Sequence, residues 1–521
     1  MVDRMASSHT TPFSGSWYPA GRAELEALLD RLFDGSLTRT GPSLLPRPLA
    51  FVVPHAGLEY SGTVAASAYR HLQAAKPERI FILGFTHRGG RPGVSIPDIA
   101  AFETPLGEVT IDRAAAREMA SSGQLALVAE STVCDHSVEI QLPLLQKVVA
   151  GVPVIPLYVG DLDSTERRAA AQALAQHIRP GDILLASSDM THYGRSFNYQ
   201  PFPAGRDVSR RLFDLDSRVI DAAGSLDAEL FLDTLHELHS TVCGHAPISL
   251  LLETLHALAD EDVFQQTLDY QTSADITGDF EHVVSYGSLG YFRADSFRLD
   301  EEAQRALLKS ARETLQHLSA TGERLAIPPA ASPLLMRRAP VFVSLHQGRE
   351  LFGCLGQVTA ETPLAEAVPT LTLDAALDDP RFAPRARVPD GIAIEISVLT
   401  PMKRIRDWKS FQLGRQGAYL ESGSRSGLLL PQVATPGRFT QTSFLETLSR
   451  KAGLRPDAYQ DPQARLSVFR RKYSGMVVRL SLPVPGCAVF GGTGFHFTVS
   501  QSRPPGDPQW RYRMGRANTL K

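Results

Sequence analysis

Titratable side chains stand directly after apolar runs in the N-terminal half of the chain. His55 follows LAFVV, His87 follows RIFILG, and Asp189 follows DILLASS. Short runs of branched apolar residues are typical of strands that are covered on both faces of a parallel sheet. Ligands of such sheets bind beyond the carboxyl ends of the strands. Three strands are therefore expected to direct these side chains toward one rim, as a metal or catalytic site requires.

Three more side chains extend this candidate site. His192 follows Asp189 by three residues, and a neighbouring carboxylate can orient an imidazole for proton transfer. Cys243 precedes an apolar helix whose positive N-terminal end should lower the thiol pKa, which makes it a candidate metal ligand or nucleophile. His136 opens another helix and is a candidate substrate-facing group. Each residue alone is more often structural, whereas together they favour one shared site.

The elements around these residues predict an α/β domain. The runs PLAFVV, RIFILG, VPVIPLYV and DILLASS are expected strands, and amphipathic segments such as SGTVAASAYRHLQA and STERRAAAQALAQHI separate them. This alternation predicts a three-layer domain with a mostly parallel central sheet. A first helix is expected in AELEALLDRLFDG, ending at Gly35.

The chain of 521 residues exceeds the usual size of one core, so more than one domain is expected. The pattern changes near residue 296, and Asp300 is a predicted N-cap before EEAQRALLKSARETLQHL. We predict domains at 1–295 and 297–481, the second of the α+β class, followed by a Gly- and Pro-rich C-terminal extension at 482–521.

Composition excludes several classes of partner. The net charge of −3 comes from 53 basic and 56 acidic residues without a long basic run, so no nucleic-acid partner is expected. The four cysteines form no CxxC pair, which is typical of reduced thiols in a cytoplasmic protein. No apolar run reaches the roughly 18 to 20 residues of a membrane span, and no signal peptide is expected.

The N-terminal motifs resemble the Memo family. They are, in family order, SGSWYPAG, VVPHAGLEYSG, RIFILGFTH, FETPLGEVTID, DHSVEIQLPLL, SSDMTHYG and STVCGHAPI. Memo proteins are similar in fold to class III extradiol dioxygenases, which hold non-haem iron. The resemblance implies His55, His87 and Cys243 as metal ligands and places His192 at the family's acid/base position. It also implies a substrate pocket lined by Asp189, Trp17 and His136.

The C-terminal motifs LFGCLG, DDPRF, IEISVLTP, GLLLPQVA and FLETLSRKAGL resemble the AMMECR family in the same way. Phe352 stands where that family usually has Arg. Cys354, His346 and Glu395 are candidates for a polar site in this domain, although a buried thiol in a tight turn is an equally simple interpretation. Memo-type and AMMECR-type proteins often occur with a radical SAM protein, which the resemblance implies as a partner.

Three functions remain open from the sequence. The first is an oxidoreductase in which Fe(II), held by two His and one Cys, acts on a small aromatic substrate with dioxygen. The second is a zinc-dependent hydrolase with His192 as proton acceptor. The third is a non-catalytic module that binds a ligand or peptide. Fe(II) is the expected cofactor of the first function, and the thiol also suits zinc or copper.

Overall fold

The structure is a computed structural model that describes residues 7–42, 44–89, 91–258, 262–326, 328, 332–348, 350–360, 362–382, 388–389, 391–434, 439–474 and 478–479. The predicted extension 482–521 lies outside the described residues. The chain divides into two compact units, Met1–Ser296 with Pro401–Asp407, and Phe297–Thr400 with Trp408–Lys521. Ser296 and Phe297 are both buried, so this junction is not an exposed polar linker.

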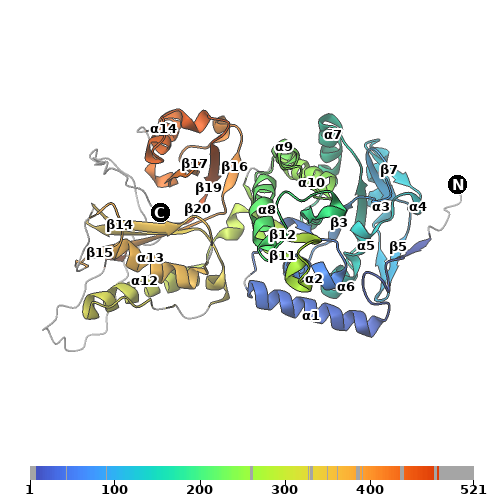
Figure 1. Ribbon diagram of the computed structural model, residues 1–521, viewed down its shortest axis with the longest axis horizontal. Coiled ribbons are helices and arrows are strands. Elements are labelled where there is room, and N and C mark those ends of the chain that lie inside the picture. The colour runs from blue at the N-terminus through green and yellow to red at the C-terminus, as the bar shows by residue number, and fades with distance from the viewer. Residues whose placement is uncertain are drawn as a thin grey trace. The chain divides into compact units, whose positions relative to one another are not determined.

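A nine-stranded sheet forms the centre of the first unit (Figure 1). Its order is β10-β12-β2-β9-β3-β8-β4-β7, with β11 beside β12. The strands span β2 (Pro48–Val53), β3 (Arg79–Gly84), β4 (Val94–Pro97), β7 (Leu125–Val128), β8 (Val154–Val159), β9 (Asp182–Ser187), β10 (His192–Tyr193), β11 (Val263–Thr272) and β12 (Val283–Arg293). All four predicted strands are present.

The sheet is mixed, which corrects the expectation of a mostly parallel one. The adjacent strands β2, β9, β3 and β8 are parallel, whereas β12 joins β2 antiparallel and β4 joins β8 antiparallel. The two long strands β11 and β12 are antiparallel neighbours along their whole length. The parallel arrangement that the sequence predicts therefore holds for the centre of the sheet, where the candidate residues follow the strands.

Helices cover both faces of this sheet (Figure 1). On one face α2 packs against β2 and β12 and α1 packs against α2, while on the other α10 packs against β9, β3 and β8. The helices of this unit are α1 (Arg22–Thr40), α2 (Leu58–Ala75), α3 (Arg113–Ser121), α4 (Glu130–Val133), α5 (His136–Glu139), α6 (Leu142–Val149), α7 (Ser164–Ala175), α8 (Val208–Gly224), α9 (Ala228–Leu238), α10 (His245–Ala257) and α11 (Ala274–Thr277). The three-layer prediction is confirmed.

The expected end of the first helix at Gly35 is wrong. The helix α1 continues to Thr40, and Gly41 ends it with a φ of 74°. A Cβ at Gly35 would lie 3.3 Å from Cγ2 of Thr63 on α2. Gly35 therefore serves the close approach of two helices, and Gly41 provides the positive φ at the helix end, which glycine adopts without strain.

A small sheet joins the N-terminus to the body of the first unit. Its order is β1 (Ser8–Thr10), β5 (Ala101–Thr104) and β6 (Gly107–Thr110), with β1 parallel to β5. None of the helices in the described part of the chain is both long and apolar enough to cross a membrane.

The second unit consists of helices and antiparallel sheets, as the α+β prediction requires. The strands β14 (Glu350–Gln357), β13 (Val341–Gln347), β15 (Ile392–Leu399), β20 (Arg471–Ser474) and β21 (Val478–Arg479) form one sheet. A second sheet contains β19 (Arg465–Phe469), β17 (Gly417–Ser422) and β18 (Arg425–Leu429). The helices are α12 (Glu301–Thr321), α13 (Leu364–Leu377) and α14 (Gln441–Lys451), while β16 (Lys403–Ile405) lies in the segment grouped with the first unit. Asp300 caps α12 as predicted, because its carboxylate accepts the N–H of Ala303 at 2.8 Å.

Candidate metal centre

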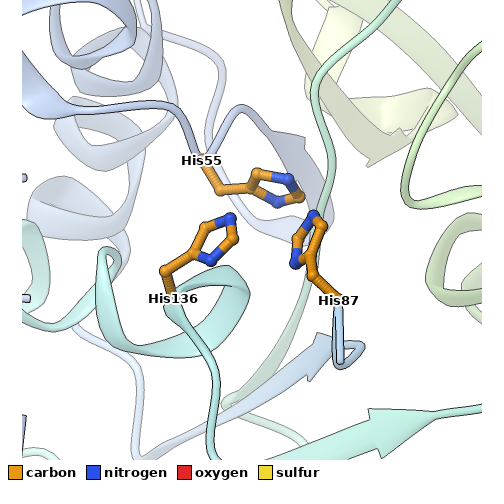
Figure 2. A group of neighbouring side chains, drawn as sticks. All are labelled: His55, His87 and His136. Atoms are coloured by element: carbon orange, nitrogen blue, oxygen red, sulfur yellow. The ribbon is translucent and has the colours of Figure 1, made fainter. Parts of the chain in front are cut away.

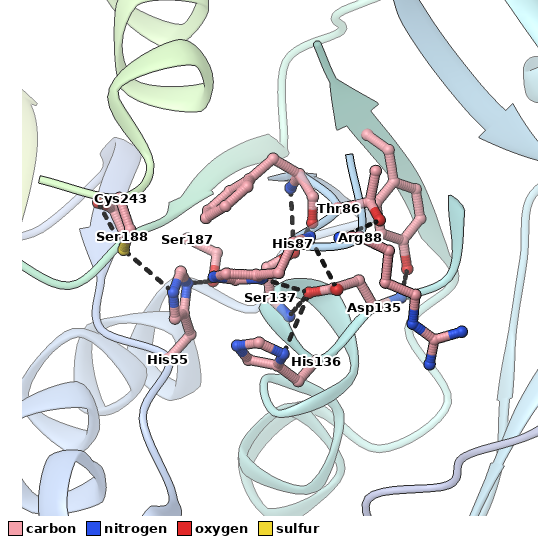
Figure 3. Close-up of polar contacts among 12 residues, drawn as sticks. His55, Thr86, His87, Arg88, Asp135, His136, Ser137, Ser187, Ser188 and Cys243 are labelled. Carbon is pink, nitrogen blue, oxygen red and sulfur yellow. Dashed lines mark hydrogen bonds and ion pairs between the residues drawn. The ribbon is translucent and has the colours of Figure 1, made fainter. Parts of the chain in front are cut away.

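His55 is the central residue of the candidate site. It follows β2 at the carboxyl end of the parallel strands, where its side chain is buried. Its Nδ1 lies 3.1 Å from Oγ of Ser187, and its Nε2 lies 3.2 Å from Sγ of Cys243 (Figure 3). Ser187 thus fixes the orientation of the ring, and the opposite nitrogen faces the thiol.

His87 is held by a carboxylate on the opposite side of the site. Asp135 accepts both the backbone N–H of His87, at 3.0 Å, and its Nδ1–H, at 2.9 Å (Figure 3). These two bonds leave Nε2 as the nitrogen that can bind a ligand. A carboxylate behind a ligating imidazole is the usual outer partner of a metal site, because it fixes the tautomer and raises the basicity of the ring.

His136 completes a group of three imidazoles (Figure 2). Its ring stacks on that of His87 with the centroids 4.1 Å apart, and lies 5.4 Å from that of His55. One ring nitrogen from each of these histidines lies within 4.8 Å of the other two. His136 also stacks on Trp17, with the centroids 4.1 Å apart. Trp17 and His136, the predicted pocket residues, are therefore in contact.

His55 also belongs to a second group of ligand atoms. Cys243 and Asp189 offer atoms within 4.8 Å of one another and of a His55 nitrogen. Of the three predicted ligands, His55 thus joins His87 in one group and Cys243 in the other. His136 stands in the imidazole group itself, whereas the sequence pattern placed it only in the pocket.

Burial keeps two of the imidazoles, those of His55 and His136, neutral near pH 7. It lowers the pKa of His55 to about 3, with His87 and His192 adding to the effect, and it lowers the pKa of His136 to about 3 as well. The pKa of Asp135 behaves differently: burial alone would raise it, but His87, His136 and backbone N–H donors bring it to about 2. Neutral imidazoles beside an ionised carboxylate are the protonation states that metal binding requires.

The expectation of a thiolate at Cys243 is wrong for the metal-free protein. Burial raises the pKa of this thiol, and the nearby carboxylate of Asp189 raises it further. The helix α10 begins only at His245, and the N–H of Gly244 donates to Ser188. Desolvation therefore exceeds the effect of the helix dipole, and a bound cation would be needed to deprotonate the sulfur.

Asp189 and His192 lie beside this centre with distinct contacts. Oδ1 of Asp189 accepts the backbone N–H groups of His55 at 2.8 Å and Ala56 at 3.3 Å, so it holds the segment that carries the first histidine. The backbone N–H of His192 donates to Thr241, and its buried Nε2 has no hydrogen-bond partner among the described residues. Burial lowers the pKa of His192, and Asp189 opposes that change.

Sequence reasoning missed Asp135, Ser187 and Gln141. Nε2 of Gln141 donates to Oγ of Ser187 at 2.9 Å and to the carbonyl of Pro54 at 3.0 Å, which supports His55 from behind. A signal for Asp135 was present, because an Asp before a helix is a common N-cap and Asp135 accepts the N–H of Ser137. No local pattern marks Ser187 or Gln141.

The candidate residues of the second unit also lie together. Ser344 on β13 pairs with Cys354 on β14 and with Glu395 on β15, and its hydroxyl donates to Sγ of Cys354 at 3.1 Å. Nε2 of His346 lies 3.5 Å from Glu395, and Arg471 lies 2.8 Å from the same carboxylate. His346 and Arg471 lower the pKa of Glu395. The cluster is a polar row across three strands.

The fold and these contacts define an α/β protein with a histidine- and thiol-lined centre beyond parallel strand ends. The family model described as Memo-like protein matches residues 10–290, and the AMMECR1 model matches residues 308–473. The chain belongs to the Memo family, and it carries an AMMECR1 domain after the Memo domain.

Two relatives agree with the Memo assignment, and one solved structure is similar to the chain without bearing on that assignment. A MEMO1 family protein of Thermoplasma volcanium is 32% identical over 278 residues, covering 53% of this chain and 95% of the relative. The memo-1 homologue of Caenorhabditis elegans is 27% identical over 284 residues, covering 53% and 80%. A solved structure of an uncharacterised protein from Pyrococcus horikoshii is 32% identical and covers 36% of this chain and 100% of its own, with a TM-score of 0.32.

Proposed function

We propose that the Memo domain is a metal-dependent oxidoreductase that acts on a small aromatic substrate with dioxygen. Fe(II) would be held by His55, His87 and Cys243. The observation that carries the proposal is that His55, which follows β2, shares one group of ligand atoms with His87 and a second with Cys243. Ferrous iron bound there would activate dioxygen and a substrate oxygen side by side.

The surrounding residues suit an aromatic substrate. Trp17 stacks on His136, which in turn stacks on His87, so aromatic rings line one side of the imidazole group. Aromatic rings bind one another through such stacked or edge contacts, which are worth about 0.5–1.5 kcal/mol beyond the area that they bury. These rings would therefore orient a substrate ring, while the metal would bind the substrate oxygen.

His192 suits the transfer of the substrate proton. Its Nε2 is buried without a hydrogen-bond partner among the described residues, and burial keeps the ring neutral. A neutral imidazole can accept a proton from a substrate hydroxyl and return it to an oxygen of the product. Both atoms of dioxygen would enter the substrate as one carbon–carbon bond breaks, so that no external reductant is needed.

Anaerobic purification of the full chain, followed by elemental analysis and oxygen-electrode assays, tests this function. The iron-loaded protein should consume dioxygen with a dihydroxyaromatic substrate, and the His55→Ala variant should not. Consumption that persists in His55→Ala, or iron that never binds, would contradict the proposal.

A zinc-dependent hydrolase is the second candidate, and the thiol of Cys243 favours it. Sulfur 3.2 Å from Nε2 of His55 is a soft ligand that suits zinc, and a zinc-bound water has a pKa of about 7. The same preparation separates the two functions. Zinc at the site, with turnover that is independent of dioxygen, would replace the oxidoreductase by the hydrolase.

A further inference from the structure

A second cluster of metal-ligating side chains lies in the Memo domain. It contains His9 on β1, Cys134 between α4 and α5, and Glu139 at the end of α5. One ligand atom from each lies within 4.8 Å of the other two. Nε2 of His9 is 3.3 Å from Oε1 of Glu139. None of these residues belongs to either group around His55.

Glu139 is the unusual member of this cluster. Its side chain has 0% exposure, and neither carboxylate oxygen has a hydrogen-bond partner among the described residues. The contact with His9 lies within ion-pair distance but does not have hydrogen-bond geometry. A buried carboxylate without hydrogen bonds is expensive unless a cation compensates it.

His9 and Cys134 provide the other two ligands of this cluster. Nδ1 of His9 lies 3.5 Å from Oε2 of Glu130, so a carboxylate stands behind the nitrogen that faces Glu139. The same arrangement orients ligating histidines in metal sites. The thiol of Cys134 is buried, and its sulfur contributes the soft ligand that zinc accepts together with imidazole and carboxylate.

Charge balance favours a divalent ion. A thiolate and a carboxylate together carry two negative charges, so that a dication with a neutral His9 leaves the buried cluster without net charge. We propose that His9 Nε2, Cys134 Sγ and a carboxylate oxygen of Glu139 bind a zinc-class divalent ion at a second site, separate from the candidate metal centre. The ion would join the N-terminal strand β1 to α5.

The alternative is an ion pair between protonated His9 and Glu139, with Cys134 as a bystander thiol. His9 contacts Glu139 in both cases, and the nearby carboxylate raises the pKa of His9. The two states differ in the role of sulfur. Only the metal site needs a thiolate, so an experiment must report the sulfur ligand directly.

The test uses the full chain with His55→Ala and Cys243→Ser, which disables both groups of the candidate metal centre. Zn²⁺ binding is measured by competition with a chromophoric chelator, and Co²⁺ loading is followed by absorption. We expect about one equivalent of bound ion and a near-ultraviolet thiolate-to-cobalt charge-transfer band. Absence of tight Zn²⁺ binding in this background would overturn the proposal.

Cys134→Ser added to that background should remove the charge-transfer band. It should also weaken Zn²⁺ binding by more than the about 10- to 100-fold that loss of an outer hydrogen-bond partner costs. The matched control replaces the remaining thiols, Cys354→Ser and Cys487→Ser, and should keep band and affinity. Far-UV circular dichroism checks folding.

His9→Gln provides an independent variant if Cys134→Ser does not fold. It changes a partly exposed side chain on a three-residue strand, and it should weaken Zn²⁺ binding by a similar factor while the cobalt spectrum loses intensity. Retention of the band and affinity in either variant, or loss of the band in the control, would show that the cluster holds no ion.

Discussion

Replacing Asp135 with Asn should weaken metal binding at the candidate metal centre without unfolding the protein. Oδ1 of Asp135 lies 2.9 Å from Nδ1 of His87 and 3.2 Å from Nδ1 of His136, and it accepts the N–H of Ser137 at 3.0 Å. Oδ2 accepts the backbone N–H of His87 at 3.0 Å. One carboxylate thus orients two of the three imidazoles.

The size of the expected loss in metal affinity follows from the hydrogen bonds that the Asn amide cannot accept. Asn has a single acceptor oxygen, and its amide nitrogen cannot accept the N–H groups that one of the carboxylate oxygens now accepts. Loss of an outer partner of a ligating histidine weakens metal binding about 10- to 100-fold, or about 1.4–2.8 kcal/mol. Asn remains a good N-cap for α5, so the free energy of unfolding should fall by only about 1 kcal/mol.

Fe(II) affinity is measured anaerobically by competition with a chromophoric chelator, and stability by urea unfolding. Asp163→Asn is the matched control, because Asp163 caps α7 by accepting the N–H groups of Thr165 at 2.8 Å and Glu166 at 2.9 Å. That variant should keep the affinity for Fe(II). Equal affinity in Asp135→Asn and in the control would refute the view that this carboxylate sets the ligand geometry at His87.

Three further predictions concern single side chains of the Memo domain. His192→Ala should keep its metal and its stability but lose about 10²- to 10⁴-fold in turnover, with a smaller loss for Asp189→Asn; loss of metal would instead make His192 a ligand. Burial lowers the pKa of His71 to about 4 from 6.5, so the unfolded chain takes up its proton first as pH falls. The neutral His71 ring contributes its whole share of the free energy of unfolding above pH 6.5, and this share falls by about 3 kcal/mol as the pH drops to 4. Urea unfolding at several pH values should therefore show a weaker pH dependence in His71→Leu than in the unchanged protein. If the variant and the unchanged protein show the same pH dependence of stability, another group is responsible for the titration. Asp216→Ala should destabilise the fold by about 3 kcal/mol, because three hydroxyls donate to that buried carboxylate, whereas exposed Asp214→Ala should change the free energy of unfolding by less than about 0.5 kcal/mol in the same assay.

The strand ends were predictable because each of them is a local pattern. β2, β3 and β9 are apolar runs that end where His55, His87 and Asp189 follow within a few residues. The antiparallel flanks were not predictable in this way, because the pairing of β12 with β2 joins residues more than two hundred positions apart. Such register depends on packing between distant segments, which no short window contains.

The site was predictable in its residues and less so in its chemistry. Position before a helix suggested a thiolate at Cys243, but desolvation of the thiol and the nearby carboxylate of Asp189 raise its pKa instead. The place of His136 in the imidazole group was not predictable, because its ring direction depends on Asp135. That carboxylate also contacts His87, forty-eight positions away in the chain. The role of Gly35 was predicted wrongly because the sequence alone does not distinguish a glycine that ends a helix from one that lets a neighbouring helix approach closely.

The length of α5 has a thermodynamic consequence. This helix is four residues long, begins with His136 in the imidazole group, and ends with Glu139 in the second cluster. A single helical turn moves as one unit, so a displacement of His136 also displaces Glu139. If the candidate metal centre and the second cluster each bind an ion, their affinities are linked through α5. Reciprocity then requires that an ion at either site changes the ion affinity of the other site by the same factor. Occupancy of the buried cluster would then change the ion affinity of the candidate metal centre, as an allosteric effector does.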